Sequence, residues 1–367
     1  MKINLNRRKN INLIYKKMKN RKLKLIISLA LALAASCDDP ETIVTNIVHP
    51  DGTITRKIEM RNLENKFELS HLQVPFDSTW EIRDSLEISE KGDTTWVKRA
   101  EKLFESVEEL NRQYASDSGA NKDIARHAEF GKKFRWFNTE YDFNEIIDKK
   151  MKYGYPVSDF LNQDELKWFF TPENLKSEKK NGSDSLRYRV FSDTVDKKLE
   201  RWYLKNIVSE WIGEFSILTD GKADNGMDKE TLKKRENEFV SIVEQDSEHF
   251  DSLWTEGALL REFLGEANAL KYKTEADSAA IIATDRFWVS FKPYTLRTVM
   301  PGRLTGTNGF VDSAGILLWP VNSDYFLSEQ YKMHAESKIP NVWAWIVSGL
   351  FILFVFTGII LRKKRKG

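Results

Sequence analysis

The C-terminal region of the chain contains twenty consecutive residues without a charge, from Val342 to Leu361. At ~1.5 Å per residue, a helix of this length covers the ~30 Å hydrocarbon core of a bilayer. Lipid offers no hydrogen-bond partners, and a helix is the structure in which one segment satisfies its own backbone groups. Trp343 and Trp345 begin the segment, at the depth where amphipathic rings prefer to lie. We therefore predict one C-terminal transmembrane helix over residues 342–361.

The short tail after this segment predicts the orientation of the span. Residues 362–367 are almost all basic, and basic segments beside a membrane span stay in the cytoplasm. We therefore expect a cytoplasmic tail and an extracytoplasmic location for the chain that precedes the span. The basic residues of the tail are Arg362, Lys363, Lys364, Arg365 and Lys366.

The N-terminus carries a second membrane signal. Residues 1–24 hold ten basic residues and no acidic one, and residues 25–36 read LIISLALALAAS. Twelve apolar residues are too few to span a bilayer, but they are typical of the apolar region of a secretory signal. We interpret residues 1–36 as a signal peptide, with Met18 as an alternative start.

The end of this signal predicts a lipid anchor. Ala34-Ala35-Ser36-Cys37 resembles the lipobox of bacterial lipoproteins, although leucine usually stands where this chain has Ala34. The resemblance implies that Cys37 becomes the acylated first residue of the mature chain. An ordinary cleaved signal and an uncleaved anchor are the alternatives. Cys37 is the only cysteine, which excludes an intramolecular disulfide and a cysteine metal cluster.

The exported part of the chain is acidic. Ten of the 57 lysines and arginines precede residue 25 and five follow residue 361, whereas all 55 acidic residues lie between, so the exported part carries a net charge of −13. Binding to nucleic acid needs a basic surface, and we therefore exclude nucleic acid as a partner. The same charge argues against broad adhesion to anionic lipid and is typical of a soluble ectodomain.

The hydrophobic pattern of the exported part changes from strand to helix and back. An aromatic run over 134–143 is apolar on both faces at its start and predicts one long buried strand. Alternation and turn residues predict strands over 42–48, 53–60, 80–88, 94–99, 287–291, 295–300, 315–320 and 325–336. Three- and four-residue spacing predicts helices over 103–115, 163–170, 196–218, 228–246, 249–264 and 270–284.

Together these patterns predict an α+β fold. We expect an antiparallel sheet from the N- and C-terminal strands, a helical central region and then the transmembrane helix. If both ends of the ectodomain are tethered to one membrane, the first hairpin and the last strands become neighbours, and the helical centre points away from the bilayer. The expected segments are a β-rich 37–105, a mainly helical 106–286 with an aromatic strand at 132–145, a β segment 287–338, the span 342–361 and the tail 362–367.

Several short motifs resemble the LppM-type domain of tethered bacterial envelope lipoproteins. The resemblance covers residues 42–60 and 295–361 and leaves out the helical centre. It implies an envelope domain that binds lipid or glycolipid, and it supplies no catalytic residues. The motifs are Asp51-Gly52 in a hairpin after the lipid cysteine, Met300-Pro301-Gly302, Thr307-Asn308-Gly309 and a strand with Trp319 before the span.

The sequence contains no motif for catalysis or for a cofactor. A nucleophile elbow, a phosphate-binding loop and a dinucleotide fingerprint are all absent from it. The acidic segment from Asp220 to Glu230 does not match the ligand frame of an EF-hand, so we interpret it as a loop in which Asp228 caps the next helix. The five histidines lack the spacing of a metal site, and we predict no catalytic residue, no metal and no cofactor. They are His49, His71, His127, His249 and His334.

Three classes of function stay open at this stage. The first is a non-enzymatic binding module of the cell envelope, with an envelope protein or a lipid as partner. The second is an envelope hydrolase of glycans or peptides that uses paired carboxylates, and the third is an outward-facing sensor subunit. We expect the bacterial inner membrane, with the ectodomain in the periplasm or outside, because outer-membrane spans are normally β-barrels. Asp38 resembles an inner-membrane retention signal.

Overall fold

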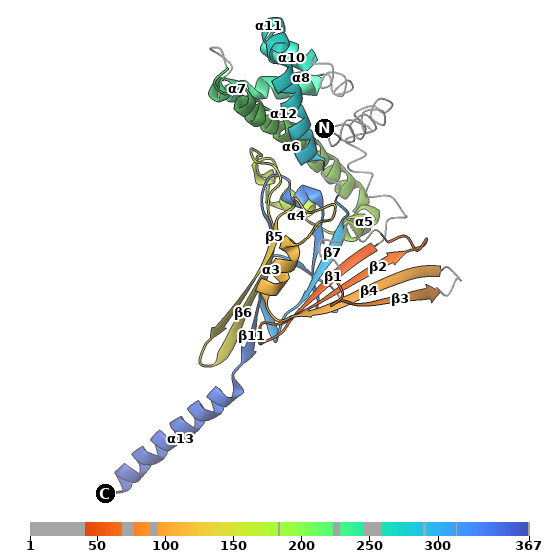
Figure 1. The fold of residues 1–367 in the computed structure, drawn as a ribbon. Coiled ribbons are helices and arrows are strands. Elements are labelled where there is room, and N and C mark those ends of the chain that lie inside the picture. Colours follow the sequence, from red (N-terminus) through yellow and green to blue (C-terminus); the bar gives the residue numbers. More distant parts are fainter. Residues whose placement is uncertain are drawn as a thin grey trace. The chain divides into compact units, whose positions relative to one another are not determined.

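The computed structural model describes residues 41–67, 77–88, 94–182, 184–222, 228–245, 258–288, 291–312 and 314–365 (Figure 1). They form two compact units. A sheet unit comprises the described parts of 40–148, 291–322 and 331–367, and a helical unit comprises those of 149–290 and 323–330. The helical unit is therefore inserted into the sequence of the sheet unit.

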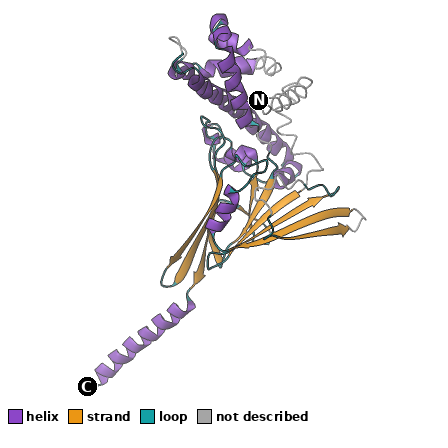
Figure 2. Ribbon diagram, viewed as in Figure 1, coloured by secondary structure: helices purple, strands orange, loops and turns teal. Residues whose placement is uncertain are grey.

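The sheet unit contains two β-sheets (Figure 2). The larger has seven strands in the order β3-β4-β2-β1-β7-β10-β9, and the smaller has four in the order β5-β6-β11-β8. The strands of the larger sheet are β1 Glu41–Val48, β2 Ile54–Asn62, β3 Glu81–Ile88, β4 Thr94–Phe104, β7 Tyr294–Val299, β9 Phe310–Val311 and β10 Leu317–Val321. Those of the smaller sheet are β5 Arg126–Phe134, β6 Asn138–Ile147, β8 Arg303–Thr307 and β11 Tyr331–Pro340.

The predicted α+β fold and the shared sheet of N- and C-terminal strands are confirmed. β1 pairs with β2 around a turn in which Gly52 has φ of +99° and donates its N–H to His49 O at 3.0 Å. The other edge of β1 pairs with β7, and this pair is parallel, in a sheet that is otherwise antiparallel. A parallel pair needs a long crossover, which the intervening chain supplies.

Among the described residues of the sheet unit, one helix precedes the C-terminal one. Helix α3, Val107–Ala115, begins after Ser106, whose hydroxyl accepts from Glu109 N–H. This cap satisfies an N–H group that the first turn leaves without an intrahelical partner. β4 runs on to Phe104, so the predicted helix over 103–115 starts four residues later than the apolar spacing indicated.

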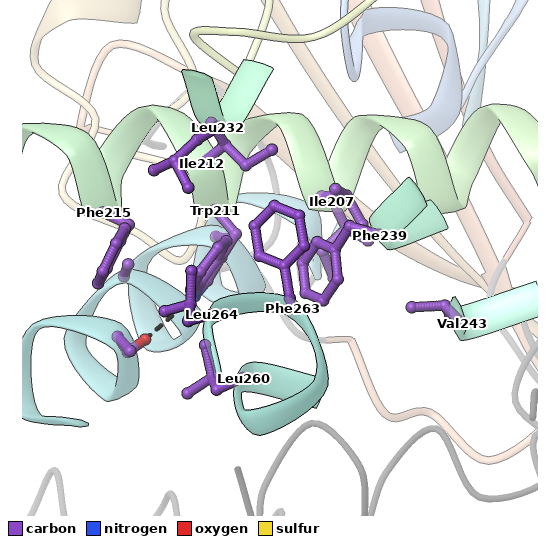
Figure 3. Packing of buried hydrophobic residues seen from close by; sticks show 14 of the residues in the cluster. Ile207, Trp211, Ile212, Phe215, Leu232, Phe239, Val243, Leu260, Phe263 and Leu264 are labelled. Atoms are coloured by element: carbon purple, nitrogen blue, oxygen red, sulfur yellow. Dashed lines mark hydrogen bonds between the residues drawn. The ribbon is translucent and has the colours of Figure 1, made fainter. Parts of the chain in front are cut away.

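The helical unit is built around helix α6, Ser185–Leu218, which extends the predicted 196–218 helix toward the N-terminus. Trp211 of α6 packs against Phe215 and Phe239 and donates its indole N–H to Ala276 O at 3.1 Å (Figure 3). The other helices in the described part of this unit are α4 Gln163–Phe169, α5 Glu173–Asn181, α7 Lys229–Lys234, α8 Glu236–Gln245, α10 Ala258–Leu264, α11 Glu266–Lys271 and α12 Lys273–Phe287, with 3-10 turns η3 Val157–Asp159 and η5 Ser323–Phe326.

Ion pairs also join α6 to α12. Glu210 and Glu214, on the polar side of α6, are both buried and both bind Arg286 of α12. Glu210 also accepts the Tyr153 N–H at 2.8 Å. The carboxylates on this side of α6 therefore hold neighbouring segments in place rather than facing solvent.

The structure corrects the predicted aromatic strand over 134–143. The run is a hairpin: β5 ends at Phe134, β6 begins at Asn138, and Arg135 N–H donates to Asn138 O at 2.8 Å. Trp136 and Phe137 therefore form the two-residue turn. The prediction failed because the two turn positions are aromatic, whereas glycine, asparagine or aspartate usually occupies so tight a turn.

Three further predictions of strands are corrected. A strand was expected over 287–291, but α12 continues to Phe287 and neither 288 nor 291 is in a strand, whereas 289–290 lie outside the described residues. The last strand was expected from residue 325, but 323–326 form a 3-10 turn and β11 begins at Tyr331. On β3, Ile82, Leu86 and Ile88 are exposed, although their alternation predicts a core face.

The C-terminal helix α13, Val342–Lys364, follows β11 after a single residue, Asn341. It is long and apolar enough to cross a membrane. Within its most apolar stretch of 18 residues, 6% is buried inside the described protein. An apolar core helix of a soluble protein would be mostly buried, and a signal sequence would lie near the N-terminus. α13 fits neither description.

Candidate functional site

The interior of the sheet unit contains a charge centre that joins the two sheets. Arg56 of β2 is 1% exposed and Glu145 of β6 is 0% exposed, and their side chains approach to 3.1 Å. Asn46 of β1 donates to Glu145 Oε2 at 2.8 Å, and the Tyr114 hydroxyl of α3 donates to Oε1 at 3.1 Å. A buried carboxylate needs such a shell, because removal from water costs far more than one ion pair returns.

A second arginine adds positive charge to this centre. The side chain of Arg126 on β5 is 3% exposed and lies 3.8 Å from Glu145, beyond hydrogen-bonding distance. Its Nη1 and Nη2 have no hydrogen-bond partner among the described residues. The guanidinium lies over the rings of Tyr114 and Tyr294 at 5.2 and 5.7 Å, which supplies part of the missing stabilisation through cation–π attraction.

These surroundings fix the protonation of the centre. Burial acts to raise the pKa of Glu145, but Arg56 and Arg126 outweigh it and hold that pKa below its ordinary value. Burial raises the pKa of Tyr294 to about 12, so this phenol stays neutral. A carboxylate held ionised between two guanidinium groups is a structural ion pair and lacks the raised pKa of a general acid.

A histidine and two carboxylates on the smaller sheet lie close enough to hold a divalent cation. The ligand atoms of Asp142, His334 and Glu336 are all within 4.8 Å of one another. The imidazole is already engaged: Nδ1 lies 2.7 Å from Asn144 Oδ1, and Nε2 lies 3.2 Å from Glu336 Oε1. Both ring nitrogens therefore face oxygen atoms of neighbouring side chains, and the group forms a polar cluster across β6 and β11.

The junction between the smaller sheet and α13 is tightly bonded. The backbone N–H of Asn341 donates to Phe137 O at 2.9 Å, and its side-chain amide donates to Arg135 O at 2.7 Å. Asn341 Oδ1 accepts from the Thr139 hydroxyl at 3.0 Å. The β5–β6 turn and the start of α13 are therefore held together by main-chain and side-chain hydrogen bonds.

Aromatic rings from the turn and the helix pack around this junction. Trp343 stacks on Phe134 with centroids 6.3 Å apart and meets Trp136 edge-on at 5.3 Å. Phe137 and Trp345 lie 4.3 Å apart. All five rings remain exposed, by 40% to 59%. We call this group the aromatic collar; it consists of Phe134, Trp136, Phe137, Trp343 and Trp345.

The structure describes most of the predicted site residues, but not all of them. Val342, Trp343, Trp345 and Leu361 lie on α13, and the basic residues up to Arg365 follow at its end, whereas Lys366 and the lipidation candidate Cys37 lie outside the described residues. Asp228 caps α7 by accepting from Thr231 N–H at 3.0 Å, as predicted. The rings that contact Trp343 and Trp345 were not predicted from the sequence. The one available signal was the group of aromatic residues on either side of Arg135.

Comparisons with known proteins add little. No family model matches the chain, and no curated protein matches it. Among solved structures, the chain is similar to the folded domain of LppM from Mycobacterium tuberculosis, at 6% identity and a TM-score of 0.26, over 83% of this chain and 92% of that domain. A TM-score this low carries no argument, so the resemblance suggested by the sequence motifs stays a hypothesis.

Proposed function

We propose that this chain is a membrane-anchored binding module of the bacterial cell envelope. The observation that carries the proposal is α13, an apolar helix that the other described residues leave almost entirely uncovered. Water is an unfavourable environment for such a surface, and a bilayer is the solvent that fits its length and composition. The basic residues at its end support a cytoplasmic C-terminus, which leaves the sheet unit at the outer face of the inner membrane.

The proposal includes export and lipidation of the N-terminus. The basic and apolar residues 1–36 support a signal peptide, and Cys37 is the acylated residue. Incorporation of an alkyne-tagged fatty acid into the intact protein, and its loss in Cys37→Ser, tests this part. A mature chain that starts at another, unmodified residue would overturn it.

The binding role rests on the chemistry of three buried carboxylates. Glu145, Glu210 and Glu214 each contact a guanidinium group, which favours a structural role over acid–base catalysis for these three residues. We therefore prefer a protein or lipid partner to a glycan or peptide substrate.

Photo-crosslinking in native membranes tests this preference. A photoreactive residue is placed in turn at exposed positions such as Ile82 and Ser118. The proposal predicts a discrete adduct with an envelope protein or lipid at some positions and none at others. Hydrolysis of peptidoglycan or peptides by the purified chain, without any adduct, would instead support the hydrolase hypothesis.

A further inference from the structure

The length of α13 determines the depth of its first turns, provided that the proposed membrane span is correct. Its basic end starts at Arg362. Counting back ~30 Å at ~1.5 Å per residue reaches Val342. The start of α13 then lies at the near edge of the hydrocarbon, and Ser348 lies roughly 9 Å inside it.

The β5–β6 turn is fixed at the same depth. Asn341 is hydrogen-bonded to the turn backbone, and Trp136 Nε1 donates to Ser348 Oγ at 2.9 Å. The ring of Trp136 therefore extends along the first two turns of the helix. If α13 crosses the bilayer, this turn cannot remain in bulk water.

The composition of the turn also fits lipid better than water. Two-residue hairpin turns at a protein surface usually contain glycine, asparagine or aspartate, because these residues adopt the turn backbone and are well solvated. Here the turn residues are Trp136 and Phe137, which are 48% and 40% exposed. Tryptophan is enriched at membrane–water interfaces, where its ring contacts acyl chains and its N–H finds a polar partner.

A basic row lies next to the aromatic collar. Lys133, Glu140, Lys338 and Arg303 are paired in register across all four strands of the smaller sheet. Arg135 lies in the turn region and binds Glu140 at 3.2 Å, so this edge carries four basic groups and one acidic group. The exported part as a whole is acidic, and the local excess of positive charge therefore complements anionic lipid headgroups.

We propose that the aromatic collar inserts into the interfacial layer of the bilayer beside α13, with the basic row against the lipid phosphates. The sheet unit then contacts the membrane through a second, non-helical element. This fixes its orientation, because a body attached at two neighbouring points cannot turn freely about the helix. The occupant of the collar surface is lipid, since the surface is continuous with the lipid-facing surface of α13.

Fluorescence quenching of the full chain in nanodiscs tests the proposal. Single cysteines that carry an environment-sensitive fluorophore are placed, in a Cys37→Ser background, at Arg135, Phe137, Phe354 and Ser118. The nanodiscs contain phosphatidylethanolamine and phosphatidylglycerol, with nitroxide lipids labelled near the headgroup or deep in the chain. Arg135 makes no ring contact in the collar and serves as a second site if the change at Phe137 disturbs packing. Phe354 reports on the span, and the exposed loop residue Ser118 is the aqueous control.

We expect shallow nitroxides to quench the labels at 135 and 137, and iodide to quench them several-fold less than the label at 118. If the label at 354 is quenched by deep nitroxides while those at 135 and 137 match 118, the collar proposal fails and the span stands. If the label at 354 is not quenched by lipid, both fail. Protection from iodide without quenching by lipid nitroxides would mean that protein covers the collar, and would also overturn the proposal.

Discussion

At the scale of single residues, Glu145 is the centre of the buried charges of the sheet unit. It is the carboxylate that connects Arg56 with Arg126, and it also accepts from Asn46 and Tyr114. Without it, two guanidinium groups would remain buried without a counter-charge. Breaking such a pair costs more than its formation contributes, because the remaining charge stays desolvated.

Glu145→Gln should therefore destabilise the sheet unit by about 3–5 kcal/mol, although the side chain keeps its shape. Urea denaturation of the chain in detergent, followed by a probe in the sheet unit, measures the change. Arg83→Gln is the matched control: Arg83 pairs with Glu81 at the surface, and its loss should change stability by less than about 0.5 kcal/mol. Equal midpoints for Glu145→Gln and the parent chain would contradict this account.

The same residue predicts a dependence of stability on pH. Its pKa in the folded chain is below the ordinary value of 4.5, so its stabilising contribution is present above pH 4.5 and is lost as the pH falls through the folded pKa. The melting temperature of the parent chain should therefore fall more steeply below that pH than the melting temperature of Glu145→Gln. Parallel curves for the two chains in this range would show that Glu145 is not the titrating group.

This charge centre was not predicted from the sequence, although one signal was present. Arg56 stands between Ile54 and Ile58 on the buried face of its strand, and Glu145 stands between Phe143 and Ile147 in the same way. A charged residue at an apolar position predicts a buried partner. The partner is 89 positions away in the sequence and in another sheet, so local patterns could not identify it.

At the scale of elements, α6 shows how closely the helical unit is packed. The ring of Tyr153 lies directly on Gly213, so closely that a Cβ there would overlap the ring. Ser209 donates to Tyr153 O at 2.8 Å and keeps the loop in place. Glycine at this helix position is therefore explained by space rather than by backbone conformation.

Gly213→Ala should destabilise the helical unit by about 1–2 kcal/mol, because overpacking outweighs the gain in helix propensity. Thermal unfolding measures the change, with Gly182→Ala as a control whose Cβ makes only ordinary contacts. In a Tyr153→Ala background the penalty should disappear. A penalty that persists there would mean that the ring is not its cause.

The hydrogen bonds of Asn341 make the junction with α13 stiff. Asn341→Ala removes the side-chain bonds to Arg135 O and Thr139 and should broaden the distance distribution between spin labels at Lys132 and Ile352. Thr357→Ala is the control, because Thr357 bonds only to Leu353 O within the helix. An unchanged distribution in Asn341→Ala would show that ring packing alone holds the junction.

Elements with a regular pattern were predicted well and the junction was not. Alternation predicted the β1–β2 hairpin, and apolar spacing predicted most of α6. The turn at Trp136 and Phe137 was predicted to be strand, because aromatic residues favour strands and neither turn position is a glycine, asparagine or aspartate. Its geometry depends on contacts with Trp343 and Trp345, about two hundred positions later, which no local rule can include.

At the scale of the whole molecule, the chain leaves the sheet unit after β6 and again after β10, returns to it at β7 and β11, and continues from β11 into α13. The parallel pairing of β1 with β7 brings the N-terminal strand beside the C-terminal part of the chain. This pairing is compatible with the predicted attachment of both ends of the ectodomain to one membrane, but it would also form without that attachment. The central claim is that α13 crosses the bilayer with its basic end inside the cell.

Cysteine labelling tests that claim most directly. Ser118→Cys and Lys364→Cys are expressed separately, and intact spheroplasts are treated with a membrane-impermeant maleimide; the parent chain gives the background from Cys37. We predict labelling of Ser118→Cys in intact spheroplasts, and labelling of Lys364→Cys only after the membrane is permeabilised. Labelling of Lys364→Cys in intact spheroplasts would contradict the proposed topology.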